Sequence, residues 1–356
     1  MVLLAPFLLI LGMLQLAASY KGLSATSLTG RHRRLGYLAG SILFVGGVFL
    51  LPGDWAGLIL VLPASLLAWA FLVAAGSLVG RDLDPARFLQ PGDWPEANCS
   101  AVSIPNRGQV IPSLFITPPA PTSAAVCLIH GSGDNKTAFK WRLISALLGR
   151  GLSVLTIDLA GHGQNRAPQR WPDCTAEIPI ALAWLRDQPD VMRVGLLGIS
   201  MGGALSAHAA AAFSPDALAL CETPISFRFR KAIVWYEIWN TLRSPILDLM
   251  GEITAWQIWR IWDAGRVERE IPLSDLIRRL DVPGQVSRLT CPLHLVYGGR
   301  DNIAPPDHGR RLQQVAPAPT QLTIVPGASH LTLILLPQTT HTLADWFARH
   351  LGAGDA

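Results

Sequence analysis

A serine, an aspartate and a histidine, met in that order along the chain, are suited to covalent chemistry. Ser200 lies in the stretch GISMG, which fits the pattern G-x-S-x-G. Asp301 follows the run LHLVYGGR, and His330 follows LTIVPGAS. A serine hydroxyl is a weak nucleophile, so it needs a histidine as base, and a carboxylate must hold that histidine in one tautomer. Together these side chains could transfer an acyl group through the serine.

Short apolar runs that alternate with helical patterns must position these residues. The runs are rich in Val, Leu and Ile and span 124–129, 152–159, 194–199, 218–221, 293–297 and 321–325. Helical patterns cover 137–148, 176–186, 201–213 and 306–315. This alternation favours a mainly parallel sheet covered on both faces, with ligands bound beyond the carboxyl ends of the strands. Residues 101–104 and 110–117 could add an antiparallel hairpin at its edge.

Five turns with recognisable motifs follow these runs. HGSG comes after 124–129 and DLAGHGQN closes 152–159, and then GISMGG, GGRD and GASH complete the set in that order. These motifs resemble the α/β-hydrolase family over about residues 99–352, with serine, aspartate and histidine in the family's chain order. The resemblance implies an α/β-hydrolase fold with a catalytic triad of Ser200, Asp301 and His330.

The resemblance also implies an oxyanion hole. A tetrahedral oxyanion needs two fixed hydrogen-bond donors. By resemblance these are the backbone N–H groups of Met201 and of Ser132, which follows His130 and Gly131 in the first loop.

Other residues of these turns are expected to support the site. Gly198 and Gly202 relieve crowding at the serine turn and let the following helix approach the sheet. Asp158 and His162 shape their turn by hydrogen bonding. Glu222, at the end of the run 218–221, is an alternative acid in case the triad aspartate only caps a turn. No metal or other cofactor is expected.

The first part of the chain holds most of the apolar surplus. Half of the 356 residues are hydrophobic and only 15% are charged, which is too apolar for an ordinary soluble enzyme. The stretches 2–18, 35–51 and 55–79 have the lengths that membrane-spanning helices need. We therefore expect three transmembrane helices in residues 1–80, with the lipid bilayer as a partner. A cleaved signal peptide is the alternative for the first stretch, but no Lys or Arg precedes it.

Cations predict the orientation of these helices. The loop KGLSATSLTGRHRR carries Lys21, Arg31, Arg33 and Arg34, whereas LPGDW carries no base. Because flanking cations stay in the cytoplasm, we expect the N-terminus outside and the larger domain in the cytoplasm. A linker rich in proline, 81–98, joins the two parts. The five cysteines form no C-x-x-C, which predicts free thiols without metal.

Residues 222–283 interrupt the alternation and predict a helical cap inserted between two strands. Within 225–262, five of the twelve tryptophans recur at helical spacing, with Arg and Lys beside them. Two readings stay open: a cap packed over the site, or an interfacial helix at a lipid headgroup layer that admits lipophilic acyl substrates.

These inferences predict a membrane-anchored serine hydrolase that cleaves a carboxylic ester or thioester, with a lipid-like substrate as an extension. One alternative is acyl transfer to an acceptor other than water. The other is a binding or scaffold subunit that keeps the fold without turnover. The net charge of +4 is modest, and no basic and aromatic array suggests a nucleic-acid partner.

Overall fold

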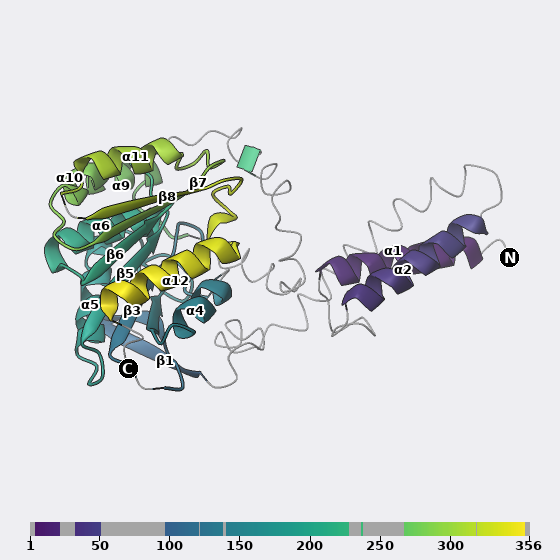
Figure 1. The fold of residues 1–356 in the computed structure, drawn as a ribbon, viewed down its shortest axis with the longest axis horizontal. Coiled ribbons are helices and arrows are strands. Elements are labelled where there is room, and N and C mark those ends of the chain that lie inside the picture. Colours follow the sequence, from purple (N-terminus) through teal and green to yellow (C-terminus); the bar gives the residue numbers. More distant parts are fainter. Residues whose placement is uncertain are drawn as a thin grey trace. The chain divides into compact units, whose positions relative to one another are not determined.

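The computed structural model describes residues 4–21, 33–50, 97–120, 122–137, 140–227, 236–237, 267–317 and 319–352. The chain divides into two compact units. One contains helices α1 (Leu4–Lys21) and α2 (Arg33–Phe49), and the other contains a β-sheet with its covering helices (Figure 1).

Helices α1 and α2 pack closely through glycines. A Cβ atom added at Gly12 would lie 2.6 Å from the backbone nitrogen of Phe44, and one at Gly47 would lie 2.7 Å from Cγ of Leu9. Only a residue without a side chain allows so close a helix approach at these positions.

The prediction of transmembrane helices is not supported. The predicted spans 2–18 and 35–51 correspond to α1 and α2, which have 18 and 17 residues. At a rise of 1.5 Å per residue each helix is about 26 to 27 Å long, at the lower end of the lengths that cross a hydrocarbon layer. Within the described residues, no helix is both long and apolar enough to cross a membrane. The predicted span 55–79 lies outside the described residues. The predicted orientation depends on all three spans, so no finding supports it.

An eight-stranded sheet forms the centre of the second unit, in the order β1-β2-β4-β3-β5-β6-β7-β8. The strands are β1 (Asn98–Asn106), β2 (Gln109–Thr117), β3 (Ala124–Ile129), β4 (Ser153–Ile157), β5 (Arg193–Ile199), β6 (Ala217–Cys221), β7 (Leu293–Gly298) and β8 (Thr320–Val325). Strands β1 and β2 form an antiparallel hairpin, and β2 pairs antiparallel with β4. All other pairs are parallel, which confirms the predicted mainly parallel sheet with a hairpin at its edge.

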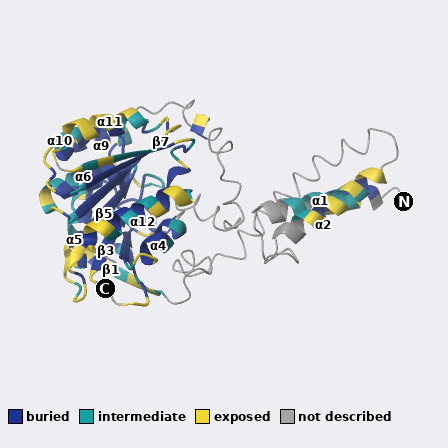
Figure 2. Ribbon diagram, viewed as in Figure 1, coloured by how far each residue is buried: buried dark blue, intermediate teal, exposed yellow. Residues whose placement is uncertain are grey.

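The inner strands are mostly apolar because both faces of the sheet are covered. Every residue of β3, β4, β6 and β7 is buried, as is all of β5 after its first residue (Figure 2). A parallel sheet with helices on both faces favours such continuous apolar runs over alternating ones.

Helices cover both faces of the sheet (Figure 1). Helices α4 (Trp141–Leu148) and α12 (Pro337–Leu351) contact each other on one face. The other face carries α5 (Glu177–Arg186), α6 (Met201–Phe213), α9 (Leu273–Leu280), α10 (Val282–Val286) and α11 (Pro306–Val315). Two short 3-10 helices, η2 (Asp173–Thr175) and η4 (Leu333–Leu335), complete the described elements.

The predicted cap lies only partly within the described residues. Its tryptophan-rich stretches, at 228–235 and 238–266, lie outside them. Residues 273–280, which the sequence assigns to the cap, form α9, whose Leu276, Ile277 and Leu280 are buried in the main core. All five cysteines lie in the described residues, none of them forms a disulfide there, and four are buried.

Candidate active site

Ser200 occupies the tight turn between β5 and α6. Its backbone has φ 52° and ψ −119°, a conformation with positive φ that a residue with a Cβ atom rarely adopts. The Ser200 N–H donates to the carbonyl of Cys221 at 2.8 Å, which ties the turn to the end of β6. A strained turn held in this way is typical of a strand-to-helix junction that presents a serine side chain.

Glycines make this turn possible. A Cβ atom at Gly198 would lie 2.6 Å from Cα of Gly203, and one at Gly202 would collide with the carbonyl oxygen of His130. The start of α6 therefore lies against both β5 and the end of β3, as expected for Gly198 and Gly202.

The structure brings Ser200, His330 and Asp301 together. The Nε2 atom of His330 lies 2.9 Å from Oγ of Ser200, and its Nδ1 atom lies 2.8 Å from Oδ2 of Asp301. The other carboxylate oxygen of Asp301 accepts hydrogen bonds from the N–H groups of Ile303 and Ala304, each at 2.8 Å. Asp301 is therefore anchored by the backbone while it holds the imidazole ring.

Two further carboxylates lie beside His330. Glu222, the alternative acid, is 1% exposed, and its Oε2 atom lies 3.4 Å from Nδ1 of His330, farther than Asp301. Its Oε1 atom has no hydrogen-bond partner among the described residues. Glu237 accepts from the N–H of His330 at 3.1 Å and from that of Asn302 at 2.9 Å. Glu237 was not predicted from the sequence, because it lies in the insertion and belongs to no motif.

These carboxylates alter the basicity of the imidazole. Burial alone would lower the pKa of His330, but Asp301, Glu222 and Glu237 outweigh it and raise this pKa to about 9. Burial, together with the neighbouring acids, raises the pKa of Glu222 well above its ordinary value, although His330 opposes this. The imidazole therefore takes up a proton more readily than a free histidine does.

The two predicted oxyanion donors flank Ser200. A Cβ atom at Gly131 would lie 3.2 Å from Cβ of Ser200, so the missing side chain lets the loop with Ser132 come close. Met201 is the first residue of α6, where N–H groups lack helical acceptors. In the described part of the chain neither N–H has a backbone acceptor.

His130 and Asp158 hold this loop through hydrogen bonds, whereas His162 bonds within its own turn. His130 donates from Nδ1 to the carbonyl of Gly131 at 2.7 Å and accepts at Nε2 from the N–H of Leu159 at 3.0 Å. The carboxylate of Asp158 pairs with the buried Lys136 and also accepts from its N–H at 2.8 Å. His162 bonds to the carbonyl of Ala160 at 2.9 Å.

The atoms of Glu222, Asp301 and His330 that could bind a metal lie within 4.8 Å of one another. However, the hydrogen bond of 2.8 Å joins Nδ1 of His330 directly to Asp301 and leaves no room for an ion between them. This geometry fits a shared proton.

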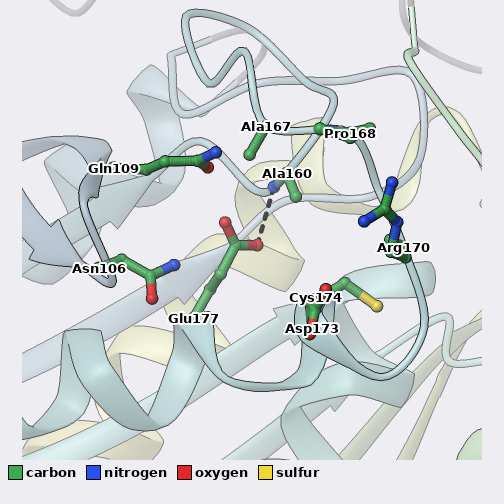
Figure 3. A pocket seen from close by; sticks show the side chains of 9 residues that line it. All are labelled: Asn106, Gln109, Ala160, Ala167, Pro168, Arg170, Asp173, Cys174 and Glu177. Atoms are coloured by element: carbon green, nitrogen blue, oxygen red, sulfur yellow. Dashed lines mark hydrogen bonds between the residues drawn. The ribbon is translucent and has the colours of Figure 1, made fainter.

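A separate polar pocket lies beside the loop between β4 and α5 (Figure 3). Its buried carboxylate, Glu177, accepts from the N–H of Ala160 at 2.8 Å, and burial raises its pKa to about 7. The lining contains none of Ser200, Asp301 and His330. Its residues are Asn106, Gln109, Ala160, Ala167, Pro168, Arg170, Asp173, Cys174 and Glu177.

Known structures share this fold. An esterase from Butyrivibrio proteoclasticus, Est1E, solved with ferulic acid bound, superposes with a TM-score of 0.54 at 17% identity, covering 71% of this chain and 100% of that one. A thermophilic esterase from Thermogutta terrifontis gives a TM-score of 0.52 at 17% identity, covering 71% and 99%. At such identities the likeness shows the fold alone.

Sequence relatives cover the same region. An uncharacterized protein of Mycobacterium tuberculosis is 27% identical over 208 residues, which are 58% of this chain and 62% of that protein. The chain thus spans less than two thirds of that relative. The pimeloyl-[acyl-carrier protein] methyl ester esterase of Chromobacterium violaceum is 28% identical over 231 residues, covering 58% of this chain and 86% of the esterase.

The profile described as "Alpha/beta hydrolase family" matches residues 126–346, more than half of the sequence. This chain belongs to the alpha/beta hydrolase family.

Proposed function

We propose that the protein is a serine hydrolase that cleaves a carboxylic ester or thioester through an acyl-enzyme. The observation that carries the proposal is one continuous hydrogen-bonded chain, 2.9 Å from Ser200 to His330 and 2.8 Å from His330 to Asp301. A serine with a base and an orienting acid at these distances is the arrangement that nucleophilic acyl transfer requires.

Each group has a defined step in this reaction. Oγ of Ser200 attacks the carbonyl carbon while its proton passes to Nε2 of His330. The oxyanion accepts hydrogen bonds from the N–H groups of Met201 and Ser132. The bond to the leaving group then breaks, and that group takes the proton from His330. Water repeats the sequence on the acyl-enzyme, with His330 again as base, and releases the acid.

The relatives favour ester chemistry. The Chromobacterium violaceum relative is named as a methyl ester esterase, and several solved structures with this fold are named as esterases. Because the fold alone hosts many reactions, the argument for this chain rests on its own site.

The test is covalent labelling of the full chain with a fluorophosphonate, together with hydrolysis of p-nitrophenyl butyrate. Wild-type protein is expected to react in both assays, and Ser200→Ala in neither. Ser123→Ala changes an exposed serine and is expected to behave as wild type. Folded wild-type protein that neither labels nor hydrolyses, or labelling that survives in Ser200→Ala, would contradict the proposal. Product analysis with and without an alcohol acceptor separates hydrolysis from acyl transfer.

A further inference from the structure

An arginine that belongs to no predicted motif lies beside the loop after β3 that carries Gly131 and Ser132, which we call the oxyanion loop. Nη2 of Arg269 donates to Oγ of Ser132 at 2.6 Å, and Nε donates to Oε1 of Gln169 at 2.8 Å. The Nε2 atom of Gln169 in turn lies 3.4 Å from the sulfur atom of Met201. Arg269 therefore touches one of the residues that supply the proposed oxyanion donors and is linked through Gln169 to the other.

The backbone holds this arginine in place. The N–H of Gln169 donates to the carbonyl of Glu268 at 2.8 Å, and the N–H of Glu270 donates to the carbonyl of Gln169 at 3.0 Å. Side chains alternate along this extended segment, so Glu268 and Glu270 are exposed while Arg269 is half-buried on the opposite side. Glu270 pairs at the surface with Arg170.

No carboxylate pairs with Arg269 in the part of the chain that the structure describes. Asp134 pairs with Lys140 and Asp158 pairs with Lys136, so the acids behind the loop already have their own cations. The nearby His162 is neutral, because burial lowers its pKa to about 3. A guanidinium group remains charged in proteins, and a partly buried charge without a counter-ion is unfavourable. Such a charge is ready to bind an anion.

The sheet order places the loops that Arg269 contacts and the loop of His330 on opposite sides of β5. Strands β3 and β4, whose loops carry Ser132 and Gln169, lie on one side of β5, and β7 and β8, which carry Asp301 and His330, lie on the other. His330 must reach the leaving-group oxygen to protonate it, so the leaving group lies toward β7 and β8. The acyl chain leaves the carbonyl carbon away from the leaving group, so it is the part of the substrate whose far end could reach the β3 and β4 side, where Arg269 lies.

We propose that Arg269 binds a carboxylate at the far end of the substrate's acyl chain. This inference rests on the proposed function and names its substrate class as monoesters of short dicarboxylic acids. The guanidinium group has donors left for such a carboxylate after its bonds to Ser132 and Gln169.

A matched pair of esters tests the proposal. The first is the p-nitrophenyl monoester of adipic acid, and the second is p-nitrophenyl adipamate, in which a neutral amide replaces the free carboxylate. Wild-type protein is expected to have the higher kcat/KM on the acid, with Ser200→Ala as the background rate. Glutaric and pimelic monoesters then report the preferred chain length.

Substitution of the arginine isolates its contribution. In Arg269→Gln the ratio of kcat/KM for the acid to that for the amide is expected to fall about 10- to 100-fold, since a charge-assisted hydrogen bond is lost. Arg269→Lys is expected to lie between. Arg170→Gln removes a cation from the same region and should leave the ratio unchanged. A loose oxyanion loop would slow both esters equally, so this ratio distinguishes binding from a merely structural role.

The outcomes separate the two proposals. A wild-type ratio near one, or a ratio unchanged in Arg269→Gln, overturns the role of Arg269 while hydrolysis of the amide ester still supports the serine hydrolase. If wild-type protein hydrolyses neither ester faster than Ser200→Ala, the proposed function itself fails.

Discussion

His330 is placed among three carboxylates rather than beside one. Asp301 bonds to Nδ1, Glu222 lies 3.4 Å from the same atom, and Glu237 holds the backbone N–H of His330. Negative charge on these groups stabilises the protonated imidazole and so raises its pKa. Only the neutral imidazole can take the serine proton, so activity is expected to fall as the pH drops below this pKa.

Glu222→Gln is expected to extend activity to lower pH. The substitution removes a carboxylate that favours the protonated imidazole, so the pKa of His330 falls and the acidic limb of kcat/KM moves down. Asp301→Asn instead removes the orienting bond and should lower kcat by about 10⁴-fold, as expected for a triad aspartate. The measurement is the pH profile of kcat/KM on p-nitrophenyl butyrate, with the exposed Asp345→Asn as control. An acidic limb that stays in place in Glu222→Gln would show that Glu222 carries no charge there.

At the scale of elements, the junction of β5 and α6 depends on the absence of side chains. Gly198, Gly202 and Gly203 each face atoms that a Cβ would displace, including the backbone of β3 and the hydroxyl of Thr223. The close approach of α6 places Ser200 and the N–H of Met201 next to the loop after β3. Packing of the helix and geometry of the proposed oxyanion hole therefore have the same cause.

Gly202→Ala is expected to weaken both stability and turnover. Its added methyl group must displace the backbone at His130, which should cost about 1–3 kcal/mol of unfolding free energy and shift the oxyanion loop. Ala212→Leu adds volume at an exposed position of the same helix and should stay within about 0.5 kcal/mol of wild type. Urea unfolding and kcat on a neutral ester provide the readouts. Wild-type stability and rate in Gly202→Ala would mean that the junction has more room than the structure indicates.

At the scale of the whole molecule, buried neutral histidines make the fold sensitive to acid. His130, His162 and His294 are at most 1% exposed, and burial lowers their pKa values to about 4, 3 and 4. In the unfolded chain each takes up a proton below about pH 6.5, whereas the native state does so only near these lower values. Acidification between the two values therefore favours unfolding. His330 and Glu177, whose pKa values are raised, act in the opposite direction.

His294→Gln isolates one of these contributions away from the candidate site. His294 lies on β7, bonds to Thr323 at 2.9 Å and packs against Trp346 of α12. Without its proton uptake in the unfolded chain, the variant should lose less stability on acidification, by about 1.4 kcal/mol for each pH unit below 6.5 and above 4. Urea unfolding at several pH values measures the difference. Parallel stability curves for variant and wild type would refute a neutral, buried His294.

Local patterns account for most of what could be predicted. Apolar runs such as 124–129 and 194–199 predict strands because burial on both faces demands continuous apolar side chains. Ser200, Asp301 and His330 are predicted to lie close together because each follows a strand of a parallel sheet, and the carboxyl ends of such strands share one edge. The expected spans 2–18 and 35–51 show the limit of composition, since apolar helices also pair with each other through glycines such as Gly12 and Gly47.

The sequence by itself determined the alternation of strands and helices, the serine turn and the order of the candidate triad, because each depends on neighbouring residues or on a repeated pattern. Only the tertiary structure decided that Glu237 contacts His330 and that Arg269 lies at Ser132 without a carboxylate partner among the described residues. These contacts join residues 93 and 137 positions apart, which no local pattern relates. Glu237 and Arg269 both belong to the insertion between β6 and β7, and their contacts with Ser132 and His330 arise from packing of the whole domain rather than from neighbouring residues.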